Sequence, residues 1–126
     1  MDYTPTEIRL QKKSRQVVVA FEGGHRFVLP FEYLRVLSPS AEVQGHGPGQ
    51  GVLQVGKENV RVTAIEPVGH YAVRLIFDDG HDSGLYTWKY LYELGIRQDS
   101  NWQAYLDRLN AAGYARQPVS DGRSND

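Results

Sequence analysis

An alternation of apolar and polar side chains predicts β-strands in two parts of the chain. In residues 7–30 the alternation occurs in three runs, with turn-forming residues between the runs. In residues 60–77 it occurs in two runs, on either side of Gly69-His70. A period of two places the apolar side chains on one face of a strand, and short turns between such runs favour hairpins. We therefore expect a three-stranded antiparallel meander followed by a second hairpin.

Two short helices are predicted from apolar residues spaced three and four apart. The first covers residues 31–37 directly after Pro30, a residue that ends a strand and suits the first turn of a helix. The second covers residues 88–94. Thr87 is a suitable N-cap for this second helix, and Gly95 suits the position just beyond its last residue.

A longer helix is predicted near the end of the chain, over residues 101–112. Ser100 and Gln103 form the S-x-x-Q pattern of a capping box, and Gly113 suits the end of the helix. Its apolar face would consist of Trp102, Tyr105, Leu106 and Leu109. Few apolar side chains follow Gly113, so we expect residues 114–126 to form a disordered tail.

These elements predict a single α+β domain over residues 1–113, with antiparallel sheets and helices that cover an apolar face. The chain has 126 residues, of which 40% are hydrophobic, and it contains 8 Tyr, 4 Phe and 2 Trp. This is enough apolar surface for one core without disulfides or other cross-links.

Composition and charge exclude several classes of protein. The absence of cysteine excludes disulfides, thiolate nucleophiles and cysteine-bound metal clusters. The net charge is -1 and the basic residues are scattered, so we expect no nucleic-acid partner. No segment approaches the roughly 20 apolar residues of a membrane span, and no apolar run follows Met1. We therefore expect a cytoplasmic protein without a signal peptide or a membrane partner.

Residues 51–57 match the G-x-x-x-x-G-K pattern of a phosphate-binding loop. Glu58 follows the lysine, where such a loop has Ser or Thr to bind magnesium. The interior of the segment, VLQV, is typical of a strand rather than of an open loop. The pattern therefore favours a strand here over a nucleotide site.

The polar turn after Phe77 contains the residues that could bind a metal. Asp79, His81 and Asp82 offer oxygen and nitrogen donors for a divalent ion. The alternative is an ordinary polar turn, in which aspartate side chains bond to nearby backbone. No Ser/His/Asp triad and no other nucleophile–base pair is visible.

A group of aromatic residues follows the same turn. Tyr86, Trp88, Tyr90 and Tyr92 could form a surface for a ligand or a partner, and we take the three tyrosines as candidates for it. The alternative is that Trp88 belongs to the core and the tyrosines to its amphipathic rim.

Three segments carry a family resemblance: FEYLR at residues 31–35, FDDGH at 77–81 and YTWKYL at 86–91. On these segments the chain resembles the N-terminal, non-catalytic domain of gamma-butyrobetaine hydroxylase and trimethyllysine hydroxylase. This domain, also called DUF971, occurs as a free-standing small bacterial protein as well. The resemblance covers roughly residues 5–95.

The resemblance also implies a metal position. In the hydroxylases, three cysteines and a histidine of this domain hold a structural zinc. When the hydroxylase segment is aligned with this chain, the three cysteines correspond to Ser38, Ser40 and Val43, and the histidine corresponds to His81. Because three of the four ligands are replaced, we expect no thiolate zinc site and no cofactor.

One alternative metal site remains around His81. The family layout would bring His46 near the His81 ring, and Asp79 or Asp82 could complete the set. Two histidines and a carboxylate would suit a divalent metal such as zinc, iron or nickel.

The resemblance implies an accessory role rather than catalysis. The iron-binding catalytic part of the hydroxylases is a separate domain that this chain does not contain, so we expect no oxygenase activity and no enzyme. A similar domain is appended to a P-loop ATPase that carries iron–sulfur clusters, which implies a link to iron or iron–sulfur metabolism. We therefore predict a non-catalytic module for an unidentified protein partner. The alternatives are a small metal-binding protein and a small enzyme of unknown type.

Overall fold

The computed structural model describes residues 3–44 and 51–119. Within them the chain forms two three-stranded antiparallel sheets and four helices, which confirms the predicted α+β class. The first sheet consists of β1 (Pro5–Gln11), β2 (Gln16–Phe21) and β3 (Arg26–Pro30), in that order. The second consists of β4 (Val62–Val68), β5 (Ala72–Phe77) and β6 (Leu85–Thr87). The helices are α1 (Phe31–Val36), α2 (Ala41–Gln44), α3 (Trp88–Ile96) and α4 (Gln98–Ala111).

The predicted hairpins are present, and their register follows the apolar alternation. In the first sheet Val17 pairs with Leu29 and Val19 pairs with Phe27. Val17, Val19 and Leu29 are buried in the main core. Tyr71 differs from the prediction, because it lies in the turn before β5 and its exposed fraction is 53%.

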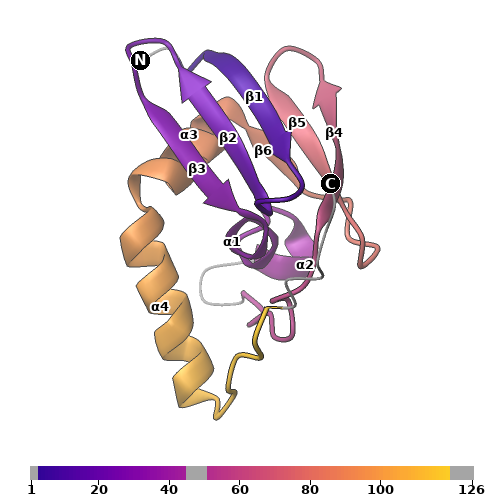
Figure 1. The fold of residues 1–126 in the computed structure, drawn as a ribbon, viewed down its shortest axis with the longest axis vertical. Coiled ribbons are helices and arrows are strands. Elements are labelled where there is room, and N and C mark those ends of the chain that lie inside the picture. Colours follow the sequence, from indigo (N-terminus) through magenta and orange to yellow (C-terminus); the bar gives the residue numbers. More distant parts are fainter. Residues whose placement is uncertain (1–2, 45–50, 120–126) are drawn as a thin grey trace.

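Both sheets contribute to one core that α1 and α3 complete. α3 contacts β3 and β6, and Figure 1 shows it behind the sheets while α4 continues from it past α1. The side chains of α1 are buried throughout, and Pro30 at its start makes no side-chain cap. Burying a side chain such as Leu34 contributes about 1.5–3 kcal/mol. Packing therefore holds this short helix in place.

Gly95 lies inside α3 rather than beyond its end, because the helix continues to Ile96. A Cβ at Gly95 would overlap the ring of Phe27 in β3. The close approach of α3 to β3 is therefore the reason for a glycine here. At the other end of the helix the predicted cap is confirmed, since Thr87 Oγ1 accepts from the Tyr90 N–H at 3.1 Å.

α4 begins at Gln98, three residues before the predicted start, and the predicted capping box does not form. Arg97 is both the C-cap residue of α3 and the N-cap residue of α4. The carbonyl of Arg97 accepts from the Asn101 N–H at 2.8 Å and from Ser100 Oγ at 3.1 Å. The direct junction between the two helices thus replaces the local cap. Gly113 follows the helix with a φ of 75°, as a C-terminal glycine should.

Two further segments differ from the sequence prediction. Residues 52–55 are not part of a strand, and Val52 is held instead by one bond from its N–H to the Val43 carbonyl at 2.8 Å. The short helix α2 was not predicted. Within the described residues, no helix is long and apolar enough to cross a membrane.

The segment after α4 contacts the body of the domain, although a disordered tail was predicted from residue 114. Figure 1 shows it turning back from the end of α4. Tyr114 and Gln117 bond to Glu58, and Arg116 bonds to Glu32. These partners lie more than 50 residues earlier in the chain, so local composition could not reveal them. The tail prediction for residues 120–126 lies outside the described residues.

Candidate functional site

Asp79, a predicted metal ligand, is bonded to two basic side chains. Its Oδ2 accepts from Arg35 Nε at 2.9 Å and from Lys57 Nζ at 3.1 Å. Its Oδ1 accepts from the His81 backbone N–H at 3.2 Å. Burial acts to raise the pKa of Asp79, but these bonds outweigh it and the pKa lies below its ordinary value. The carboxylate therefore fixes the turn to α1 and to the loop before β4.

The His81 ring is buried between two partners, one on each nitrogen. Its Nε2 lies 2.8 Å from Ser38 Oγ, and its Nδ1 lies 3.3 Å from Glu42 Oε2. Burial lowers the pKa of His81 below its ordinary value, and the positive charge of Arg35 acts in the same direction. A neutral ring that donates from Nδ1 to Glu42 and accepts the Ser38 hydroxyl at Nε2 satisfies these contacts.

Ser38, His81 and Glu42 thus have the connectivity of a hydrolase triad, which the sequence did not reveal. Ser38, however, is fully buried. A Cβ at Gly84 would overlap Ser38 Oγ, so the backbone packs directly against the hydroxyl. Because a nucleophile must reach the carbonyl it attacks, this arrangement serves as a buried hydrogen-bond cluster.

The carboxylates of Asp79 and Asp82 form no hydrogen bond or ion pair with the His81 ring. Asp82 is exposed, and His46 lies outside the described residues. Within residues 3–44 and 51–119, no group of three or more histidine, aspartate or glutamate side chains could hold a metal ion. The structure therefore brings His81 together with Ser38 and Glu42.

The three tyrosines predicted as an interaction surface are anchored inside the domain. Tyr86 is fully buried, and its hydroxyl donates to the Leu34 carbonyl at 2.6 Å. The Tyr90 hydroxyl donates to the Leu37 carbonyl at 2.6 Å. Tyr92 is half-buried in a cluster of rings. The other rings of this cluster are Tyr3, Phe21, His25 and Phe27. The alternative interpretation holds for Tyr90 and Tyr92 at the rim, but Tyr86 rather than Trp88 is the fully buried member, and Trp88 is half-buried against the core.

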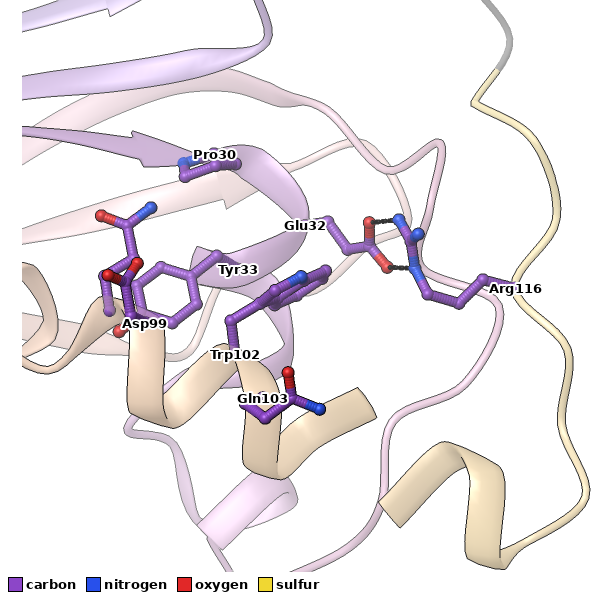
Figure 2. Close-up of a pocket in the computed structure, with 8 residues that line it drawn as sticks. Pro30, Glu32, Tyr33, Asp99, Trp102, Gln103 and Arg116 are labelled. Atoms are coloured by element: carbon purple, nitrogen blue, oxygen red, sulfur yellow. Dashed lines mark hydrogen bonds and ion pairs between the residues drawn. The ribbon is translucent and has the colours of Figure 1, made fainter. Parts of the chain in front are cut away.

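An open pocket lies elsewhere, where the start of α1 meets α4 and the C-terminal segment. Its volume is about 600 Å³. The lining residues are Pro30, Glu32, Tyr33, Gln98, Asp99, Trp102, Gln103 and Arg116. Figure 2 shows Trp102 in the middle of the pocket, with Tyr33 and Asp99 to one side and the Glu32–Arg116 pair to the other. The pocket therefore combines an aromatic wall with charged groups.

The Glu32–Arg116 pair forms one end of this pocket. Two nitrogens of the Arg116 guanidinium donate to the Glu32 carboxylate. Nε donates at 3.0 Å, and Nη2 donates to the other oxygen. The Glu32 side chain is only 9% exposed. The Arg116 guanidinium carbon also lies 5.3 Å from the centre of the Trp102 ring. A guanidinium bound in two-point contact by a carboxylate and stacked on an indole is a strong mode of cation recognition.

A second buried carboxylate, Glu58, lies under the same C-terminal segment. It accepts from the Tyr114 hydroxyl at 2.9 Å and from the Gln117 backbone N–H at 2.6 Å. Burial acts to raise the pKa of Glu58, but these bonds outweigh it and the pKa lies below its ordinary value. Residues 114–117 thus provide bonding partners for two acids of the domain.

Comparison with known proteins identifies the family. Residues 8–92 match the model of the family described as gamma-butyrobetaine hydroxylase-like, N-terminal. The chain belongs to this family. No curated protein matches it.

Solved structures that are similar to this gamma-butyrobetaine hydroxylase-like N-terminal domain include the following three. Two are NMR solution structures at 50% and 51% identity, with TM-scores of 0.79 and 0.78. The matches cover 98% and 93% of this chain, and 92% of each of those chains. The third is a crystal structure of a DUF971 protein of unknown function from Acidithiobacillus ferrooxidans, at 43% identity and a TM-score of 0.63. That match covers 74% of this chain and 93% of the other.

The residues at the position that the resemblance to the hydroxylases assigns to zinc do not fit a structural zinc. Ser38 and Ser40 offer neutral hydroxyls, which are poor zinc ligands, and Val43 offers no donor. His81 is the remaining donor, and its Nε2 faces Ser38 Oγ. Ser40 Oγ has no hydrogen-bond partner although it is buried. The position therefore consists of the Ser38–His81 contact, the buried Val43 side chain and a Ser40 hydroxyl without a partner.

Sequence reasoning missed the pocket for identifiable reasons. Trp102 was assigned to the apolar face of α4, and the structure leaves it half-buried at the pocket wall. Arg116 was assigned to the tail. Glu32 is the available signal, because it is an acid in a short helix that otherwise consists of apolar and aromatic residues and Arg35.

Proposed function

We propose that this domain is a non-catalytic accessory module that binds a protein partner through the pocket at Trp102. The observation that carries the proposal is the pocket itself, which is open and has an aromatic wall with charged groups at both ends. Concave, largely apolar sites with a few placed polar groups are typical binding sites. The half-buried Trp102 ring at the pocket wall is a residue type that often concentrates binding energy at interfaces.

The chemistry of the buried residues supports a role without catalysis. The serine–histidine–glutamate cluster is sealed from solvent at Ser38. The charged groups of the open pocket are a carboxylate–guanidinium pair and an aspartate, without a nucleophile beside a base. We therefore expect no hydroxylation of gamma-butyrobetaine or trimethyllysine by the chain alone with iron and 2-oxoglutarate. Turnover above the background without protein would contradict this expectation.

Affinity capture from the protein's own cell extract tests the interaction function. The wild type should retain a partner at near-stoichiometric yield, and Trp102→Ala should lose it while keeping the folded NMR spectrum. Lys89→Ala, an exposed change on α3, is the matched control and should retain the partner. Equal capture by all three proteins would contradict a role for the pocket. The identity of the partner also tests the link to iron or iron–sulfur metabolism that the family resemblance implies.

Binding of a divalent metal is a second candidate function, favoured by one observation. His81 Nδ1 lies 3.3 Å from Glu42 Oε2, and the buried hydroxyl of Ser40, two residues before Glu42, has no hydrogen-bond partner. A nitrogen and a carboxylate are suitable donors for iron or zinc. Metal content after purification without a histidine tag, compared with His81→Ala, decides between the two functions. Stoichiometric metal in the wild type alone would favour the metal-binding function.

A further inference from the structure

We propose that the pocket at Trp102 binds an arginine side chain that the partner protein presents. This inference rests on the proposed interaction function and adds the chemistry of the recognised group. It is carried by the charge of the pocket, by its aromatic wall and by the way Arg116 is held at one end.

The pocket has an anionic group that is not already neutralised. Two carboxylates and one guanidinium line it, so its net charge is negative. The positive charge of Arg116 compensates the negative charge of Glu32. Asp99 is exposed and forms no hydrogen bond or ion pair within the part of the chain that the structure describes. The Asp99 carboxylate is therefore available to bind a cation that enters the pocket.

The walls suit a guanidinium group on an apolar stem. The Trp102 indole and Pro30 provide apolar surface next to Asp99. An arginine can stack its planar group on an indole while it donates two bonds to a carboxylate. The volume of about 600 Å³ lies within the range of about 300–1,000 Å³ that is common for ligand sites.

Arg116 shows within the same molecule how a guanidinium is held here. It combines a two-point bond to Glu32 with a position over the Trp102 ring. A partner's arginine would make the equivalent contacts on the Asp99 side. The pocket would then hold two guanidinium groups, each paired with its own carboxylate, with Tyr33 and Tyr105 packed against the Trp102 ring at centroid distances of 6.3 and 5.2 Å.

Asp99 also has a structural role that the test must separate from binding. It lies in the first turn of α4, where a negative charge interacts favourably with the helix dipole. Loss of that interaction changes the stability of the helix, whereas loss of binding changes the response to an added ligand. The measurement must therefore report ligand binding directly.

The test titrates two tripeptides into the full-length, nitrogen-15-labelled protein and follows its NMR spectrum. One peptide is acetyl-Gly-Arg-Gly-amide, and the other carries citrulline, a neutral analogue of nearly the same shape. The arginine peptide should shift the Trp102 indole signal with a dissociation constant in the millimolar range. The citrulline peptide should bind at least about tenfold more weakly.

Two variants complete the experiment. Asp99→Asn should weaken binding of the arginine peptide at least about fivefold while signals away from the pocket stay unchanged. Asp82→Asn removes the same charge from an exposed site elsewhere and should leave binding unchanged. Equal binding of both peptides, equal effects of both variants, or no shift at Trp102 would each overturn the proposal. If a partner is still captured through Trp102 after such a result, the arginine chemistry fails and the interaction function stands.

Discussion

At the scale of single residues, Glu32 and Glu58 connect the domain to its C-terminal segment. Both side chains are buried, and both receive hydrogen bonds from residues 114–117. A buried charge without a partner is costly, so these bonds determine how the segment lies on the domain.

Arg116→Ala should lower the free energy of unfolding by about 1–3 kcal/mol, because it leaves the Glu32 carboxylate buried without its donors. Chemical denaturation of the two proteins measures the difference. Arg108→Ala removes the same charge from an exposed position of α4 and should change stability by no more than about 0.5 kcal/mol. Equal losses in the two variants would show that the Glu32 contact contributes nothing specific.

Glu58 should make stability depend on pH in the acid range. Its carboxyl has a pKa below the ordinary value of 4.5 in the folded state, whereas the unfolded chain titrates near 4.5. The unfolded state therefore binds more protons below this pH, and the contribution of Glu58 is present above pH 4.5 and lost as the pH falls. Glu58→Gln should have a flatter dependence of unfolding free energy on pH below 4.5. Parallel curves for the two proteins would contradict this account.

At the scale of secondary structure, close packing explains where sequence patterns failed. Period-two alternation predicted the hairpins because one face of each sheet is buried. The capping box at Ser100 and the terminal role of Gly95 were wrong because α3 and α4 meet directly at Arg97. Phe27 also requires the glycine inside α3. The direct succession of the two helices and the long-range contact with Phe27 override the local preferences for helix ends.

Gly95→Ala tests the packing of α3 against β3. The helix propensity of alanine is about 1 kcal/mol more favourable than that of glycine. The Cβ of an alanine at this position, however, would overlap the Phe27 ring. Overpacking costs about 1–3 kcal/mol, so we expect a net loss of stability in thermal and chemical unfolding. In the Phe27→Ala background the same change should be neutral or stabilising. Stabilisation of about 1 kcal/mol in the native background would contradict the close contact.

At the scale of the whole molecule, the C-terminal segment belongs to the domain as far as Gln117. A chain that ends at Gln117 keeps all the bonds to Glu32 and Glu58, so its melting temperature should be nearly unchanged. A chain that ends at Gly113 loses them and should melt about 10 °C or more lower, since each unpaired buried group costs about 1–3 kcal/mol. Differential scanning calorimetry compares the two. Equal melting temperatures would show that residues 114–117 do not stabilise the domain.

The family and the position of His81 were accessible from the sequence because their motifs are local. The pocket was not, because it depends on contacts between α1, α4 and residue 116. The sequence predicts no thiolate zinc at His81 and leaves a divalent-metal site there as an alternative, and the structure pairs the His81 ring with Ser38 and Glu42. Glu42 was missed because it lies in the unpredicted helix α2.

The central claim is that this domain binds a protein partner at the pocket beside Trp102. The most direct test places the photo-crosslinking amino acid p-benzoylphenylalanine at Gln103, on the exposed lining of the pocket, in the protein's own cells. The same residue at Lys89, exposed on α3, is the control. Our account predicts one dominant crosslinked partner from Gln103 and little or none from Lys89. No crosslink from Gln103, or equal yields from both positions, would contradict it.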